Sequence, residues 1–518
     1  MSNQTSDNNK RIAKNTLLLY FRMFFIMAVT LYTSRVVLKT LGVEDFGIYN
    51  VVGGIVAMMG VLNGAMSVST QRYLTFELGK GDMIRLKQVF ATCFLIYLLL
   101  SGIFFVLAET IGLWFLNNKL VIPNDRIVAA NWIFQFSIIS SINSLMSNPY
   151  NAVLIAREKM NIYAYIGIIE AILKLIIAYV IIISPFDKLI VYGGLFFIMS
   201  LVVTMIYRIY CIRNYKESKF KFYWDKQLFK QLLSYSGWNL FGSMSAMVKG
   251  QGLNILLNLF FNPAINASRG IAYQINNAIT QFFNNFYTAV RPQITKYYAQ
   301  GDLENMFKLV FRSSKFSYYL IFLLSLPIII EAPAIIQLWL GQLPEYVVPF
   351  TRMIILITAV DAMANPLMTA CHSTGKIKLY QSVVGTLVIL NVPISYCFLK
   401  FMNCSPTIVF TISLVLSVIA LFMRVGIVKR LISSFPAWEY IYKVFGMSMV
   451  ISVLSMILPV ILHKLLPSSL VSTIVVTLAS ISSTLVFIYA LGMTRGEKDA
   501  MLGIIKNKMT IALYRYHA

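Results

Sequence analysis

The chain has 518 residues, of which 58% are hydrophobic and 12% charged, and its mean hydropathy is +0.73. This composition excludes an ordinary soluble domain and is typical of a protein embedded in a bilayer. A net charge of +24 in a soluble chain would suggest nucleic acid as a partner. Here the basic residues lie mostly in short links between apolar segments, where membrane topology explains them, so no nucleic-acid partner is expected.

Apolar windows of about 20 residues, separated by polar breaks, predict an all-α integral membrane protein with fourteen transmembrane helices. The first of them is too long for a signal peptide and is expected to remain as an uncleaved span. The predicted spans are 15–38, 47–71, 88–108, 127–154, 160–183, 189–211, 234–260, 264–290, 312–330, 346–371, 379–400, 405–427, 440–463 and 468–492.

The distribution of Lys and Arg gives the orientation. With the N-terminus inside, the basic residues of the inward links outnumber those of the outward links by about five to one. This pattern predicts that both termini are cytoplasmic.

The chain also repeats itself at an interval of about 220 residues. Gly81-Asp82 recurs as Gly301-Asp302, and Glu109 recurs as Glu331. The pairs keep their order, so we predict two parallel six-helix bundles with a substrate path between them. The expected parts are an N-terminal bundle (1–215), a cytoplasmic amphipathic linker (216–233), a C-terminal bundle (234–432), and helices 13 and 14 with a cytoplasmic tail (433–518). In the basic stretch 216–230, a solvated linker and a lipid-contacting helix are equally good interpretations.

Polar residues recur every three or four positions in the spans 234–260 and 264–290, which places them on one helix face. A polar face of this length cannot point at lipid, although amides and small residues also serve helix packing. We interpret these faces, together with buried basic residues of the first span, as a cationic, water-filled path for an anionic cargo. The candidate substrate-binding residues are Arg22, Arg35, Asn50, Asn239, Lys249, Asn254, Arg269, Asn277 and Asn284.

Two acidic residues within spans are ion-coupling candidates, Glu170 and Asp361. Glu170 lies four residues before Lys174, a spacing that favours an intrahelical ion pair. Asp361 either relays a proton or binds a cation, or it pairs with Arg352 or with a basic residue of a neighbouring helix.

No metal site, cofactor or catalytic residue is expected. The five cysteines and three histidines lack metal-ligand or disulfide spacing, and Thr374-Gly375-Lys376 lacks the upstream glycine of a phosphate-binding loop. An integral-membrane glycan polymerase or ligase would need a large outward loop, and the outward links are short. We therefore predict that the chain is not an enzyme.

The residues around the first two spans resemble a known family. Lys14-Asn15-Thr16-Leu17, Arg22 and the segment 41–49 (Leu-Gly-Val-Glu-Asp-Phe-Gly-Ile-Tyr) are similar to the polysaccharide transporters of the multidrug/oligosaccharidyl-lipid/polysaccharide exporter superfamily, which include O-antigen and capsule-unit flippases. The resemblance covers the whole chain through its span number and duplication.

This resemblance implies a flippase of the bacterial inner membrane. By alternating access it would move undecaprenyl-diphosphate-linked oligosaccharides to the periplasmic leaflet for surface polysaccharide biosynthesis, beside polymerase and chain-length proteins. Cationic residues of helices 1, 2, 7 and 8 meet the diphosphate in that family; Arg22, Lys249 and Arg269 fit, whereas the second helix offers only Asn50. The alternative is a proton- or sodium-coupled drug or organic-cation antiporter of the same superfamily, which would use Asp361 and Glu170.

Overall fold

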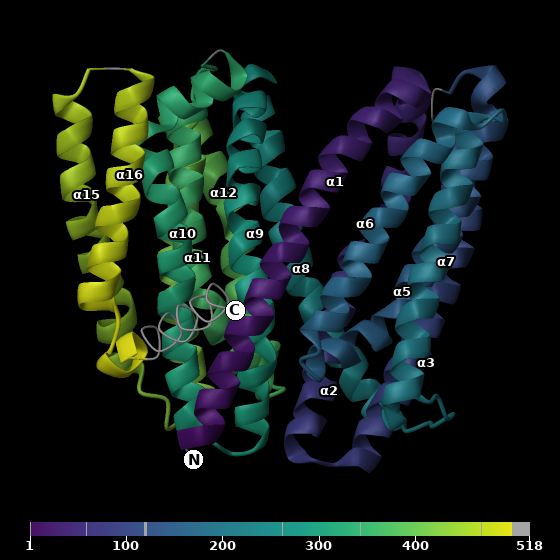
Figure 1. The fold of residues 1–518 in the computed structure, drawn as a ribbon, viewed down its shortest axis with the longest axis horizontal. Coiled ribbons are helices and arrows are strands. Elements are labelled where there is room, and N and C mark those ends of the chain that lie inside the picture. Colours follow the sequence, from purple (N-terminus) through teal and green to yellow (C-terminus); the bar gives the residue numbers. More distant parts are fainter. Residues whose placement is uncertain are drawn as a thin grey trace, which may run out of the picture. The chain divides into compact units, whose positions relative to one another are not determined.

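The computed structural model of the protein describes residues 2–57, 60–118, 122–261, 263–341, 343–467 and 469–499. Throughout these residues the regular elements are helices, and they include no strand. The long helices are α1 (Ser2–Ala57), α2 (Gly60–Lys80), α3 (Met83–Leu107), α5 (Ile127–Ala156), α6 (Met160–Ile183), α7 (Lys188–Asn214), α8 (Lys226–Phe260), α9 (Pro263–Ala299), α10 (Leu303–Leu340), α11 (Val347–Ser373), α12 (Lys378–Met402), α13 (Ile408–Leu431), α15 (Met447–Leu465) and α16 (Leu470–Phe487) (Figure 1). The short helices are α4 (Leu113–Asn118) and α14 (Ala437–Tyr440).

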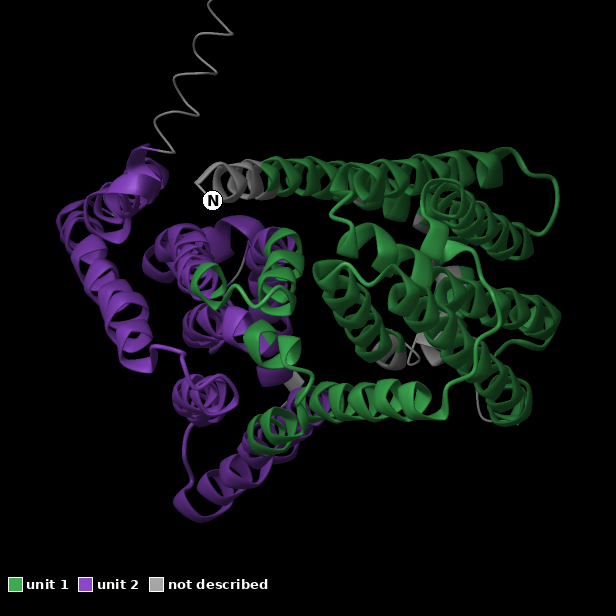
Figure 2. Ribbon diagram, turned by 90° about the horizontal axis from the view of Figure 1, so that it is seen from below, with its two compact units in different colours: residues 1–246, 288–306, 369–385 green, residues 247–287, 307–368, 386–518 purple. Residues whose placement is uncertain are grey.

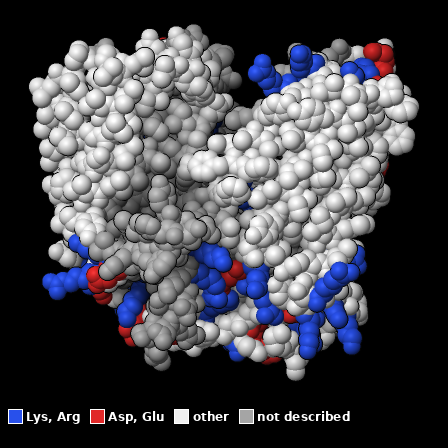
Figure 3. Space-filling model, viewed as in Figure 1, with Lys and Arg blue, Asp and Glu red and all other residues white. Residues whose placement is uncertain are grey.

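Ten of the described helical segments are long and apolar enough to cross a bilayer, so the chain is a multi-pass membrane protein. Charged side chains gather over the ends of the helices on the face drawn in Figure 3, and the surface between is almost free of them. The polar helices α8 and α9, together with α2 and α5, are not among the ten. The count of fourteen spans and the cytoplasmic termini therefore stay predictions.

Glycine marks the break between the first two predicted spans. α1 covers the first of them and runs into the second, where it ends at Ala57, but Gly42 inside it has non-helical angles, φ 79° and ψ 171°. A positive φ of this kind is readily adopted only by glycine. The chain thus bends within the segment 41–49.

The repeated Gly-Asp pair forms the same helix-to-helix junction twice. Gly81 (φ 78°) and Gly301 (φ 74°) follow α2 and α9 in the left-handed conformation that ends helices. Asp82 then accepts hydrogen bonds from two backbone amides of the first turn of α3, at 3.1 and 2.8 Å. Asp302 accepts one from the amide of Asn305 at 3.2 Å, at the start of α10. Each aspartate caps the next helix, which gives this repeat a structural reason.

The repeated glutamates, Glu109 and Glu331, also lie at similar irregular points of the helical backbone. Glu109 lies in the π-helical turn Ala108–Gly112 after α3, and its carboxylate accepts a hydrogen bond from Gln135 at 3.1 Å. Glu331 interrupts α10 with φ −96° and ψ 21°, and its carboxylate lies 2.6 Å from Nδ1 of His463. Both acids thus sit where a helix departs from regularity and bind a polar side chain of another helix.

The chain forms two compact units (Figure 2). Unit 1 contains 1–246, 288–306 and 369–385, and unit 2 contains 247–287, 307–368 and 386–518. Unit 1 thus combines the first seven helices with one end of each of α8, α9, α10, α11 and α12. The bundle boundaries expected from the repeat stay predictions.

Candidate functional site

A polar cavity of about 440 Å³ lies within unit 1, between α1, α5, α6 and α7. It forms where α1 packs on α6 and α5 packs on α7. Five of its lining residues are serines of α5, and further hydroxyl and amide groups come from α5 and α7. The polar lining residues are Ser137, Ser140, Ser141, Ser144, Ser147, Asn151, Tyr163, Glu170, Ser200, Thr204, Tyr207 and Arg22. Hydroxyl-rich walls of this kind can hydrogen-bond a ligand that carries many hydroxyl groups.

Arg22 of α1 places a positive charge at this cavity. Its guanidinium carbon lies 4.5 Å from the centroid of the Tyr163 ring, a cation–π contact. A Cβ at position 167 would lie 2.2 Å from Nε of Arg22, so the side chain needs glycine at that position of α6. The Nε atom is buried and has no hydrogen-bond partner among the described residues, and no carboxylate of the described residues forms an ion pair with Arg22.

Glu170 lines the same cavity but is already paired. Nζ of Lys174 donates to its carboxylate at 2.7 Å, one helical turn along α6. The ion pair predicted from the four-residue spacing is therefore confirmed. Among the described residues that line the cavity, Arg22 is left as a cation without a carboxylate partner.

In unit 2, Arg269 joins α9 to α8. Its Nη1 donates to Oδ1 of Asn254 at 3.1 Å, and its Nη2 donates to the carbonyl of Gly250 at 2.7 Å. Asn266 donates to the carbonyl of Asn254 at 3.2 Å. The guanidinium carbon also lies 4.7 Å from the centroid of the Tyr273 ring. The structure brings the two candidate residues Arg269 and Asn254 together in an arrangement that holds two helices, and their role in substrate binding stays a prediction.

Asp361 of α11 lies near two cations of the same unit. Its carboxylate is 3.9 Å from Nη1 of Arg424 on α13, and Lys249 of α8 interacts electrostatically with both groups. The predicted alternative of a basic partner on a neighbouring helix is confirmed. Pairing with Arg352 is wrong, because that side chain donates to the carbonyls of Ile329 and Ile330 at 2.8 and 3.4 Å. Arg352 thereby satisfies backbone oxygens beside the break in α10 at Glu331.

The other predicted site residues are dispersed. Arg35 on α1 and Asn277 and Asn284 on α9 are exposed. Asn239 is buried in unit 1 and accepts a hydrogen bond from Gln381 of α12 at 3.2 Å. Lys249, Asn254 and Arg269 belong to unit 2. The side chain of Asn50 lies outside the described residues.

A buried carboxylate that the sequence analysis did not identify joins three segments of unit 1. Glu158, in the turn between α5 and α6, is 4% exposed and has φ 57°. It forms ion pairs with Lys296 of α9 and, at 2.9 Å, with Arg11 of α1. Gln293 of α9 also donates to its carboxylate, and Asn15 of α1 donates to its carbonyl at 3.4 Å.

Arg72 forms a second such connection. From α2 it donates to the last carbonyls of α11, those of His372 at 3.1 Å and Ser373 at 2.7 Å. These are the backbone acceptors that a helix C-terminus leaves unpaired, and a cation there also complements the helix dipole. Arg72 and Glu158 together tie the first seven helices to the ends of α9 and α11.

Solved structures with this arrangement of helices are known. An outward-facing multidrug resistance MATE family transporter of the MOP superfamily matches with a TM-score of 0.71 and 12% identity, over 83% of this chain and 97% of that chain. MATE in complex with MaD3S matches with a TM-score of 0.70 and 13% identity, over 82% and 97%. The chain has the fold of MOP-superfamily transporters.

A third match from the same superfamily differs in its described function. It is a MOP superfamily transporter from Pyrococcus furiosus, described as having a binding pocket of reverse polarity that suggests a different function, with a TM-score of 0.66, 13% identity, and coverage of 81% and 96%. No family model and no curated protein matches the chain. At these identities the likeness establishes the fold, and the cargo has to be argued from the side chains.

Proposed function

We propose that the chain is an alternating-access transporter whose cargo has an anionic head and a hydroxyl-rich body. The class that fits is a lipid-linked oligosaccharide of the undecaprenyl-diphosphate type, moved from the cytoplasmic to the periplasmic leaflet of a bacterial inner membrane. The observation that carries the proposal is Arg22, which faces a serine-lined cavity and has no carboxylate partner among the described residues.

The chemistry of the cavity matches both ends of such a cargo. A guanidinium group binds phosphate oxygens through directed, charge-assisted hydrogen bonds, which are stronger in a partly desolvated cavity than in water. Serine, threonine and asparagine groups can donate to and accept from sugar hydroxyls. Lys249 and Arg269 of unit 2 stay predicted contacts of the cargo.

The second candidate is a proton- or sodium-coupled antiporter of drugs or organic cations. The comparisons favour it over the first, because similar structures are named multidrug transporters. The charges favour the first, because Glu170 pairs with Lys174 and Asp361 lies beside Arg424, so neither acid offers a carboxylate without a basic neighbour. The reverse polarity described for the binding pocket of the Pyrococcus furiosus structure, and the different function suggested for it, support the view that one fold serves different functions.

A transport assay on the full chain in vesicles separates the two candidates. One set of vesicles carries a fluorescent polyprenyl-diphosphate-linked disaccharide, and translocation is followed with a membrane-impermeant quencher. A second set carries a fluorescent organic cation under a proton or sodium gradient. The proposal requires movement of the lipid-linked sugar that Arg22→Gln reduces and that Lys188→Gln, an exposed lysine of the same unit, leaves unchanged.

Cation efflux that depends on the gradient and disappears in Asp361→Asn, without movement of the lipid-linked sugar, would instead establish the second candidate. If the cargo is a lipid-linked sugar, we further propose that the chain works beside a polysaccharide polymerase and chain-length proteins.

A further inference from the structure

The exposed charges of the stretch 216–230, which connects α7 to α8 and includes the first residues of α8, are all positive. Its five lysines are exposed, namely Lys216, Lys219, Lys221, Lys226 and Lys230. Its two acids are both engaged in ion pairs. Glu217 is 1% exposed and pairs with Arg157 at 2.6 Å. This one-sided charge would attract a negatively charged surface or molecule.

The second acid, Asp225, also has hydrogen-bond and ion-pair partners. Its carboxylate accepts hydrogen bonds from the backbone amides of Leu228 at 3.1 Å and Gln227 at 2.8 Å, and it lies 3.4 Å from Nη1 of Arg85. The bond from the Leu228 amide, followed by that from Gln227, holds the pKa of Asp225 below its usual value, so the group stays an anion that caps α8. The lysines around it have no neutralising acid within the stretch.

The stretch is held in one place against unit 1. After the short turn Lys216–Ser218, residues 219–225 run without a helix, so this segment is not an amphipathic helix. Phe220 packs on Phe94 of α3, with ring centroids 4.8 Å apart, and Trp224 packs on Phe229, with centroids 4.9 Å apart. Its exposed aromatic residues are therefore presented in a fixed position.

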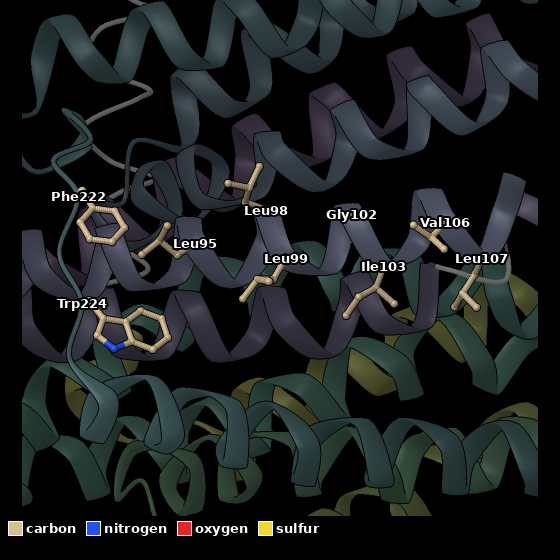
Figure 4. Close-up of a pocket in the computed structure, with 9 residues that line it drawn as sticks. All are labelled: Leu95, Leu98, Leu99, Gly102, Ile103, Val106, Leu107, Phe222 and Trp224. Atoms are coloured by element: carbon tan, nitrogen blue, oxygen red, sulfur yellow. The ribbon is translucent and has the colours of Figure 1, made fainter.

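An apolar groove of about 690 Å³ continues from these aromatic residues along α3. Figure 4 shows Phe222 and Trp224 at one end of the groove and Val106 and Leu107 at the other. Leu95, Leu98, Leu99, Gly102 and Ile103 line it between those ends. Lys87, exposed, lies eight residues before Leu95 on the same helix, near the aromatic end.

The dimensions fit one hydrocarbon chain in one leaflet. From Leu95 to Leu107 the helix rises by about 18 Å at 1.5 Å per residue. Half of the hydrocarbon core of a bilayer measures about 15 Å. Lysines lie at the aromatic end, and tryptophan is enriched at the level of lipid headgroups. One end of the groove thus has the chemistry of a headgroup site and the rest that of a tail site.

We propose that the α3 groove and the stretch 216–230 form a binding site for one anionic glycerophospholipid. Its phosphate contacts Lys219, Lys221 and Lys226, its glycerol region lies against Phe222 and Trp224, and one acyl chain lies along Leu95 to Leu107. This site is separate from the Arg22 cavity and does not depend on which cargo is carried.

Lipid retention by the purified full-length chain tests the proposal. The protein is equilibrated in detergent with equal amounts of phosphatidylglycerol and phosphatidylcholine of identical acyl chains, and retained lipid is counted by native mass spectrometry. We expect phosphatidylglycerol to be retained about tenfold more than phosphatidylcholine, and we expect this preference to be lost in a Lys219→Gln, Lys221→Gln, Lys226→Gln variant. Equal retention of the two lipids by the unaltered chain would overturn the proposal.

Two further variants separate charge and tail effects. The matched control, Lys159→Gln, Lys376→Gln, Lys429→Gln, removes three exposed lysines elsewhere and is expected to keep the preference for phosphatidylglycerol.

Gly102→Leu tests the groove for the acyl chain. A Cβ at Gly102 meets no atom within 4 Å, so the leucine side chain can fill the groove, and leucine has a higher helix propensity than glycine. It is expected to lower retention of long-chain phosphatidylglycerol about fivefold, in line with the loss of contact along one acyl chain. If inorganic phosphate or a six-carbon-chain phosphatidylglycerol competes as well as the long-chain lipid, the groove takes no acyl chain and the proposal fails.

Discussion

Arg22 in unit 1 and Arg269 in unit 2 have similar sequence contexts but different surroundings in the structure. Both lie on helices that bear further polar residues, and both guanidinium carbons lie over a tyrosine ring, at 4.5 Å and 4.7 Å from its centroid. Arg269 donates to Asn254 and to the Gly250 carbonyl, whereas Arg22 faces a cavity lined by hydroxyl groups. The comparison teaches that an arginine within a membrane helix can bind a cargo or hold its own helices, and that its hydrogen-bond acceptors decide between these roles.

The largest expected effect is on transport by Arg22→Gln. If the guanidinium binds the anionic head of the cargo, its loss removes charge-assisted hydrogen bonds worth about 1.5–3 kcal/mol, which corresponds to a ten- to hundredfold loss of transport. The initial rate of lipid-linked sugar translocation measures it. Thermal unfolding should stay within a few degrees of the unaltered chain, and an unchanged rate would refute the cavity as the site.

Gly167→Ala tests the position of the Arg22 guanidinium without changing any charge. The added Cβ would meet the Arg22 side chain at 2.2 Å and push the guanidinium away from Tyr163. We expect transport to fall several-fold, less than in Arg22→Gln, because the displaced charge remains near the cavity. Gly237→Ala, where a Cβ meets no atom within 4 Å, is the control and should transport normally.

Arg269→Gln is expected to act on stability more than on transport. It removes two hydrogen bonds between α8 and α9 and leaves the Gly250 carbonyl without its donor, a loss of about 2 kcal/mol. The fall in the unfolding temperature in detergent, compared with that of the exposed variant Asn277→Ala, measures this effect. A variant that is as stable as the unaltered chain but inactive would place Arg269 with Arg22 as a cargo-binding residue.

The smallest effect is expected for Glu170→Gln. The carboxylate belongs to a partly exposed pair with Lys174, and such pairs contribute about 0.3–0.5 kcal/mol. Movement of the lipid-linked sugar should change less than twofold, because a charge within the pair binds no cargo. Cation efflux that disappears in this variant would contradict that assignment and favour the antiporter.

Much of the helical framework could be predicted because it depends on local information. The length of the apolar segments predicted the helices. The recurrence of Gly81-Asp82 as Gly301-Asp302 indicated two matching junctions, and the four-residue spacing of Glu170 and Lys174 predicted their ion pair. The serines of α5 could also have been found, since Ser137, Ser140, Ser144 and Ser147 recur with helical spacing. They went unrecognised because small residues equally suit helix packing.

The remaining features depend on contacts between distant segments. The sequence offered Asp361 several basic partners, and only the packing of α11 against α13 brings Arg424 near it. Whether Arg269 points at a cargo or at Gly250 is likewise decided by how α8 and α9 approach each other. Glu158 carried no signal, because a single glutamate in a turn is usually solvated.

Glu158 makes one short turn the meeting point of two helices. Its single carboxylate forms ion pairs with Arg11 near the start of α1 and with Lys296 near the end of α9. Removing this carboxylate would loosen both helices from the turn at once, whereas removing either cation would loosen only one of them. A residue outside the regular helices thus determines how firmly three parts of the chain, distant in sequence, are held to one another.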